Sequence, residues 1–191
     1  AETVAKVLSH FDISLFLSKS FVSTPMVSLG VVNKNADLGI VITASHNPPE
    51  YNGYKLKGSF GGPLSPEDVQ AIEDMIPEIN TINYDKIKLS KLLDKNQLIY
   101  VDLEQEYCSH ARNNFDISLI NDSKINFAYD AMFGAGMNIV KKLLPNITFL
   151  HCSNNPGFLG IPPEPIHRNL NEFSNLIKNS DINCGLATDG D

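Results

Sequence analysis

Short apolar runs with the character of β-strands alternate with helical patterns along the chain, and this alternation limits the possible folds more than any other feature. The clearest run, residues 38–43, is nearly all apolar and rich in β-branched side chains, which is typical of a strand buried on both faces. Further strands are expected at residues 13–17, 54–57, 125–129, 147–150 and 182–188. Helices are expected at residues 1–9, 24–35, 65–76, 103–113, 134–144 and 169–179. This order predicts an α/β protein.

Proline and small polar residues mark the start of two of these helices. Thr24 is expected to cap a helix that has Pro25 in its first position, and Ser65 is expected to cap the third helix. The buried stripe of the third helix is predicted to comprise Val69, Ile72, Met75 and Ile76. Residues 81–96 are polar and lack periodicity, so they are expected to form a linker with a short helix before a second unit that starts near residue 100.

Charge and cysteine content argue against several classes of protein. The net charge is −7 and no basic cluster exceeds two adjacent residues, which disfavours nucleic-acid binding. The apolar runs are too short for a membrane-spanning helix. The three cysteines are far apart and form no CxxC pair, and no secretory signal is visible, so a reducing, cytoplasmic location is expected. Because the chain starts with Ala and stops just after an expected strand, we expect it to be a fragment cut at both ends.

Three of the expected strands end in small, polar loops, at residues 42–46, 129–134 and 186–191. Ligands of open α/β sheets bind outside the carboxyl ends of the strands, so these loops are the first candidates for a functional site.

Ser45 lies two residues beyond the clearest strand, in a loop stiffened by Pro48 and Pro49. A hydroxyl held on such a support suits a nucleophile or a phosphoryl carrier, and the neighbouring His46 can exchange protons near neutral pH. The GxSxG elbow of serine hydrolases is absent, because Thr43 and Asn47 stand where its glycines would be. From the residues alone, a turn without any chemistry remains the commoner interpretation.

Two further features are compatible with phosphate chemistry. Lys55 follows the turn that returns from the Ser45 loop, where it could lie beside a phosphate or simply be solvated. Asp189 and Asp191 flank a glycine, and paired carboxylates suit a hard cation such as Mg²⁺. A DGD sequence alone is more often a surface turn than a metal site.

The segment Gly39-Ile-Val-Ile-Thr-Ala-Ser-His-Asn-Pro-Pro-Glu-Tyr-Asn-Gly-Tyr-Lys55 resembles the active-serine segment of the α-D-phosphohexomutase superfamily, the phosphoglucomutases and phosphomannomutases. Other segments resemble this family in the same order, namely Ser23-Thr-Pro25, Gly160-Ile-Pro-Pro-Glu-Pro165 and Leu186-Ala-Thr-Asp-Gly-Asp191. The resemblance implies two consecutive three-layer α/β/α domains with mostly parallel mixed sheets, domain I at residues 1–98 and domain II at residues 99–191, both truncated. Domains III and IV of the full-length chain would be further partners.

The resemblance also implies a function. Ser45 would carry a phosphoryl group between the 1- and 6-positions of a hexose phosphate, through a bisphosphorylated sugar, in an isomerase of the phosphotransferase type. Asp189, Asp191 and the phosphorylated Ser45 would hold Mg²⁺, and glucose 1,6-bisphosphate would be the activator. Lys55 would supply positive charge or act as general base, with His46 as the alternative base. This fragment alone would be inactive, and glucose or mannose phosphates would be the substrates.

Other functions remain open at this level. The protein could be a catalytically inactive sugar-phosphate-binding homologue, or a phosphopentomutase of the same family. A serine hydrolase would require a histidine and an acid to converge on Ser45.

Overall fold

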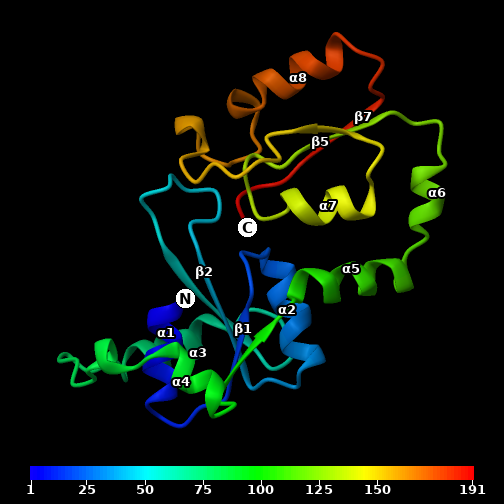
Figure 1. The fold of residues 1–191 in the computed structure, drawn as a ribbon. Helices are drawn as coiled ribbons and strands as arrows, with labels where there is room; N and C mark the ends of the chain where they lie inside the picture. Colours follow the sequence, from blue (N-terminus) through cyan, green and yellow to red (C-terminus); the bar gives the residue numbers. More distant parts are fainter.

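The computed structural model describes residues 1–191, which form two α/β units connected through a long helix (Figure 1). The elements of the first unit are α1 (Glu2–Ser9), β1 (Leu15–Ser18), α2 (Thr24–Asn33), β2 (Leu38–Thr43), β3 (Gly53–Gly58), α3 (Pro66–Glu73), a 3₁₀ turn (Tyr84–Lys86), α4 (Leu89–Asp94) and β4 (Leu98–Val101). The remaining elements are α5 (Leu103–Asn114), α6 (Ile117–Asn121), β5 (Phe127–Asp130), α7 (Met137–Leu143), β6 (Thr148–Leu150), two 3₁₀ turns (Phe158–Gly160 and His167–Asn169), α8 (Asn171–Lys178) and β7 (Cys184–Ala187). None of the helices has the length and apolar character needed to cross a membrane.

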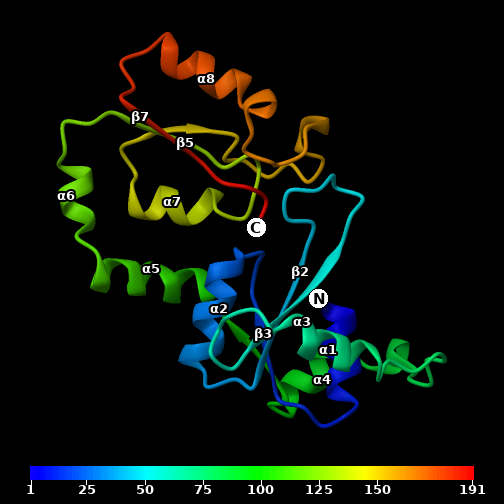
Figure 2. The ribbon, with the colours of Figure 1, turned by 180° about the vertical axis from the view of Figure 1, so that it is seen from behind.

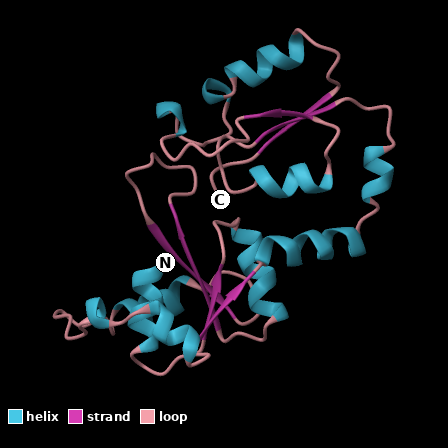
Figure 3. Ribbon diagram, in the orientation of Figure 1, coloured by secondary structure: helices cyan, strands magenta, loops and turns pink.

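The sheets are mostly parallel, as the alternation of elements predicts. In the first unit β1 pairs with β4 in parallel, and β2 pairs with β3 in an antiparallel hairpin. In the second unit β5 is the central strand of a parallel sheet with the order β6-β5-β7. This sheet lies between α7 and α8 in three layers (Figure 3). The expected mixed, mostly parallel α/β/α class is therefore confirmed.

The division expected between residues 98 and 99 stays a prediction. Strand β4 spans it and pairs with β1, so that Leu15 lies opposite Leu98. Helix α5 then begins at Leu103, with the Asp102 side chain accepting a hydrogen bond from the backbone N–H of Gln105.

The two units share a small hydrophobic core. Met26 of α2, Leu103 and Cys108 of α5, and Ile139 of α7 form one buried cluster. Because α2 belongs to the first unit and α7 to the second, this cluster fixes the loops after β2 and β7 relative to each other. Figure 2, seen from behind, shows the C-terminus between α7 and α2, at the junction of the units.

Several expected core positions are exposed, and these predictions were wrong. In β2, Leu38 and Ile42 are 43% and 38% exposed. Helix α2 packs against the face that carries Gly39, where an added Cβ would meet Val31, whereas Leu38 and Ile42 lie on the opposite face. Helix α3 ends at Glu73, so Met75 and Ile76 follow it as exposed residues rather than continuing a buried stripe. The accessible surface is 11901 Å², against about 9,000 Å² expected for a compact protein of this mass, in keeping with the small size of its cores.

Helix boundaries also differ in detail from the sequence prediction. Ser23, not Thr24, is the N-cap of α2, and Pro25 lies in its first turn. Helix α6 was not predicted, because its five residues are too short to show a helical period.

Candidate active site

The Ser45 loop is a tight turn that directs the serine away from its strand. Ser45 has a φ of 53°, the left-handed conformation that residues other than glycine rarely adopt. Its backbone N–H donates to Thr43 Oγ1 at 2.8 Å, and the N–H of Asn47 donates to the Ala44 carbonyl at 2.9 Å. Such backbone strain costs roughly 1–3 kcal/mol and is found most often at functional sites.

Two carboxylates from the far end of the chain meet this hydroxyl. Asp189 and Asp191 follow β7, and they lie 144 and 146 residues from Ser45 in sequence. Ser45 Oγ is 3.2 Å from Asp189 Oδ2 and 3.1 Å from Asp191 Oδ1. The serine is therefore placed at the junction of the two units, with acceptors for its single proton on the second unit.

Glycine is required between the two aspartates. A Cβ atom on Gly190 would overlap the carbonyl oxygen of Ser45 and would lie 3.1 Å from Pro163 Cγ. The close approach of the two backbones explains why the sequence here is Asp-Gly-Asp.

Lys55 and Thr24 fix the carboxylate of Asp191. Lys55, on β3, places its Nζ 2.7 Å from Asp191 Oδ2, and the Asp191 side chain is only 11% exposed. Thr24, at the start of α2, donates from its backbone N–H to the Asp191 carbonyl at 2.7 Å and from its hydroxyl to Oδ2 at 3.1 Å. The first unit therefore binds this residue of the second unit through both its backbone and its side chain.

The electrostatics of the site keep Asp191 ionised. Burial acts to raise the pKa of Asp191, but hydrogen bonds from Lys55, Thr43 and Ser45 and the charge of Lys55 outweigh it, so the pKa is lowered. The carboxylate therefore carries its negative charge throughout the physiological range of pH.

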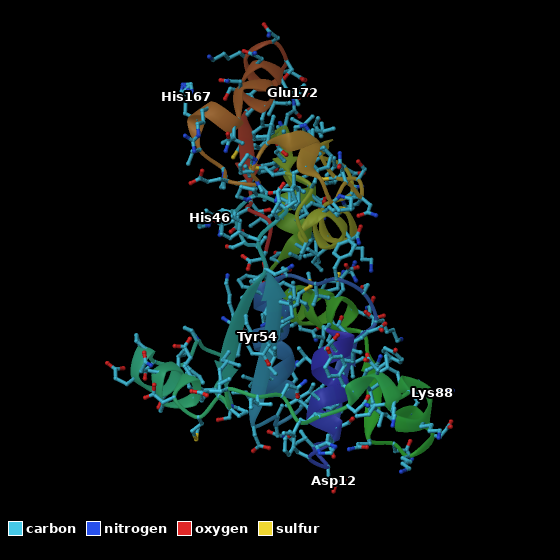
Figure 4. The ribbon with its side chains drawn as sticks, turned by 90° about the vertical axis from the view of Figure 1, so that its left-hand side faces the viewer. Asp12, His46, Tyr54, Lys88, His167 and Glu172 are labelled. Atoms are coloured by element: carbon cyan, nitrogen blue, oxygen red, sulfur yellow. The ribbon has the colours of Figure 1, made fainter.

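His46 is not part of this cluster. Its side chain is exposed, and its ring makes no hydrogen bond within the protein. Figure 4 shows His46 at the level of the junction, projecting away from the ribbon. Of the residues singled out from the sequence, the structure brings Ser45, Lys55, Asp189 and Asp191 together and leaves His46 at the rim.

Comparison with known proteins assigns the family. The domain I model of phosphoglucomutase/phosphomannomutase, described as an alpha/beta/alpha domain, matches residues 1–83, and the domain II model matches residues 105–191. The chain belongs to this family. It is 29% identical to a phosphoglucomutase of Staphylococcus aureus over an alignment of 206 positions, gaps included, which covers all of this chain and 36% of that protein.

Solved structures agree. A putative phosphomannomutase from Thermus thermophilus superimposes with a TM-score of 0.84 at 28% identity, covering all of this chain and 43% of that one. A phosphoglucomutase/phosphomannomutase family protein from Burkholderia thailandensis has a TM-score of 0.69 at 17% identity, which shows the shared fold. The chain thus spans less than half the length of each of these relatives.

The oxygen atoms at this candidate site fit a hard divalent cation. Asp189 and Asp191 offer carboxylates beside the Ser45 hydroxyl, and Mg²⁺ typically uses one or two carboxylates together with phosphate and water oxygens. The chain contains no group of three or more His, Cys, Asp or Glu side chains arranged for a metal ion, so further ligands would have to be phosphate, water or another part of the protein.

Sequence reasoning missed the contributions of Thr24 and Thr43. Thr24 donates a hydrogen bond to the Asp191 carboxylate, and Thr43 is hydrogen-bonded to both the Ser45 backbone and Asp191. Both threonines lie far from Asp191 in the sequence. The Ser-Thr-Pro start of α2 was the available signal, and it indicated a helix N-terminus and a resemblance to the family but no contact with Asp191.

Proposed function

We propose that the protein containing this chain is a phosphohexomutase that interconverts hexose 1-phosphate and hexose 6-phosphate through a phosphorylated Ser45. The observation that carries the proposal is the position of Ser45 Oγ, 3.2 Å from Asp189 and 3.1 Å from Asp191, with Lys55 paired to Asp191. The membership of the chain in the phosphoglucomutase/phosphomannomutase family supports the same class of reaction.

In the first transfer, a sugar hydroxyl attacks the phosphorus on Ser45. The bond between phosphorus and Ser45 Oγ breaks as a bond to the sugar oxygen forms, the sugar hydroxyl gives up its proton to a base, and the base passes that proton on to the freed Ser45 oxygen. In the return step, Ser45 Oγ attacks the other phosphate of the bisphosphorylated sugar and the bond between that phosphorus and its sugar oxygen breaks. The serine proton passes through the base to the sugar oxygen, which leaves as a hydroxyl. Glucose 1,6-bisphosphate would supply the first phosphoryl group.

Lys55 provides positive charge beside the transferring group. Phosphoryl transfer is accelerated largely by positioning and by neutralising the phosphate oxygens, and an ammonium held next to Ser45 suits that role. Because an ammonium cannot also accept a proton, the base at the sugar hydroxyl would be either Lys55 in its neutral form, in place of this charge role, or the exposed His46. A bound Mg²⁺ would supply further charge neutralisation, and Asp189, Asp191 and phosphorylated Ser45 are the residues that would hold it.

The test is chemical labelling of the full-length protein. Incubation with glucose 1,6-bisphosphate should place one phosphate on Ser45, detected by peptide mass mapping, and the Ser45→Ala variant should lose both the label and mutase turnover. A Ser118→Ala variant removes a serine hydroxyl that is hydrogen-bonded to a different aspartate, and it should keep both.

The other outcomes are distinct. If Ser45 never carries phosphate while sugar phosphate still binds, the protein is an inactive homologue and the proposal is wrong. If turnover is restricted to pentose phosphates, the protein is a phosphopentomutase. Reaction with a fluorophosphonate probe would favour a serine hydrolase, although the side-chain partners of Ser45 Oγ are carboxylates and not histidine.

A further inference from the structure

Asp130, a buried carboxylate in the second unit, takes no direct part in the proposed chemistry. It ends the central strand β5 and is 1% exposed. A buried charge is stable only when its oxygens are hydrogen-bonded. Asp130 Oδ1 accepts the backbone N–H of Met132 at 2.8 Å, and His151 Nδ1 lies 3.0 Å from Oδ1 and 3.2 Å from Oδ2. Both carboxylate oxygens are therefore engaged in shaping the turn that follows the strand.

His151 holds this turn from its other side. The histidine follows β6, its ring packs against Phe133 with 4.7 Å between the ring centroids, and Nε2 lies 3.5 Å from Glu172 Oε2 on α8. Because a carboxylate can only accept hydrogen bonds, His151 Nδ1 donates to Asp130. The His151 carbonyl in turn accepts the backbone N–H of Phe133 at 2.9 Å.

The turn is strained, so it needs these contacts. Met132 and Phe133 both have left-handed backbones, with φ of 47° and 59°, and His151 has a φ of 48°. Neighbouring left-handed residues other than glycine persist only when the surrounding structure enforces them, at a cost of roughly 1–3 kcal/mol each. Asp130 and His151 are the side chains whose hydrogen bonds are in place to do so.

The residues that follow the strained positions, Gly134 and Ala135, contact the Asp-Gly-Asp loop directly. The N–H of Ala135 donates to the Gly190 carbonyl at 3.0 Å, and the N–H of Thr188 donates to the Asp130 carbonyl at 3.1 Å. A Cβ atom on Gly134 would overlap the Asp189 carbonyl oxygen and would lie 2.9 Å from Gly190 Cα. The loop is thus supported by this turn on one side and by Ser45 on the other.

We propose that Asp130 and His151 are positioning residues for the cation site of Asp189 and Asp191. They act through the turn at residues 131–134, whose shape sets the position of the two aspartates. Neither Asp130 nor His151 touches the reacting atoms. The proposal rests on the proposed function only in assuming that a divalent cation binds there.

The test compares metal binding with local order in the full-length protein. The Asp130→Asn variant keeps the size of the side chain but removes its negative charge, and it replaces the acceptor Oδ2, 3.2 Å from His151 Nδ1, by an NH₂ donor. Mn²⁺ affinity, measured by calorimetry, should fall by about 10–100-fold, as is typical when a group that orients metal ligands is altered. In metal-free protein, the Ala135 and Thr188 amides should exchange hydrogen faster. High Mg²⁺ should restore turnover, which it would not do if the variant were merely unfolded.

The control is Asp116→Asn, which alters a carboxylate that accepts the Leu119 N–H at the start of α6, away from the site. This variant should change neither Mn²⁺ affinity nor exchange at Ala135 and Thr188. If Asp130→Asn fails to fold, Gly134→Ala, which displaces the loop from the same side, should show the same fall in Mn²⁺ affinity. Wild-type Mn²⁺ affinity and exchange in folded Asp130→Asn would overturn the inference, whereas a wild-type protein that binds no Mn²⁺ would instead refute the cation site of the proposed function.

Discussion

Replacing Gly190 by alanine is the most direct perturbation of the contact between the two units. The added Cβ would lie roughly an ångström inside the ordinary contact distance of about 3.4 Å from the Ser45 carbonyl oxygen, and it would also crowd Pro163 Cγ at 3.1 Å. Both obstacles are rigid, since one is backbone and the other is a proline ring. The Asp-Gly-Asp loop therefore has to move away from Ser45 by about 1 Å.

The size of this shift sets the expected loss of activity. A displacement of about 1 Å among reacting groups can cost about 100-fold in rate, or roughly 2.7 kcal/mol of transition-state stabilisation. We expect kcat of the full-length Gly190→Ala variant to fall by that factor in a coupled mutase assay, with slower phosphate transfer from Ser45 in single-turnover measurements.

Gly157→Ala is the matched control. Its Cβ would meet only Asn155 Oδ1, at 3.7 Å, so activity and stability should stay close to wild type. If Gly190→Ala retains kcat within twofold and melts at the wild-type temperature, the close approach of residues 45 and 190 does not position the catalytic groups, and the reasoning fails.

Three further predictions test the electrostatics, the shared core and a local cap. Lys55→Met should raise the pKa of Asp191, measured from the chemical shift of its carboxyl carbon in an NMR titration. Because the pKa of Asp191 is lower in the folded than in the unfolded protein, its ionised carboxylate stabilises the fold above pH about 3.9, and this stabilisation is lost as the pH falls through the folded-state pKa. In urea titrations at neutral pH, Lys55→Met should therefore be less stable than wild type, and the difference should shrink in acid. Met26→Ala should cost about 2–5 kcal/mol in urea unfolding, because Met26 is 1% exposed. Ser65→Ala removes the acceptor of the Asp68 N–H at the start of α3, and it should cost about 1 kcal/mol with no change in Ser45 labelling.

Local sequence patterns predicted the helices and strands better than they predicted which side chains are buried. The apolar run of β2 and the Ser-Pro start of α3 predicted the right structures because strand propensity and capping depend on near neighbours. Exposure of Leu38, Ile42 and Met75 could not be predicted in the same way, because it depends on which faces other elements cover.

The residues of the candidate site divide along the same line. The sequence by itself identified Ser45, Lys55, Asp189 and Asp191 as chemically suitable, since the motif and residue types are visible in the linear chain. Only the tertiary structure decided that His46 lies apart and that Thr24 fixes Asp191. The physical reason is that packing of α2, α5 and α7 brings together loops more than 140 residues apart, and no short-range pattern encodes that distance.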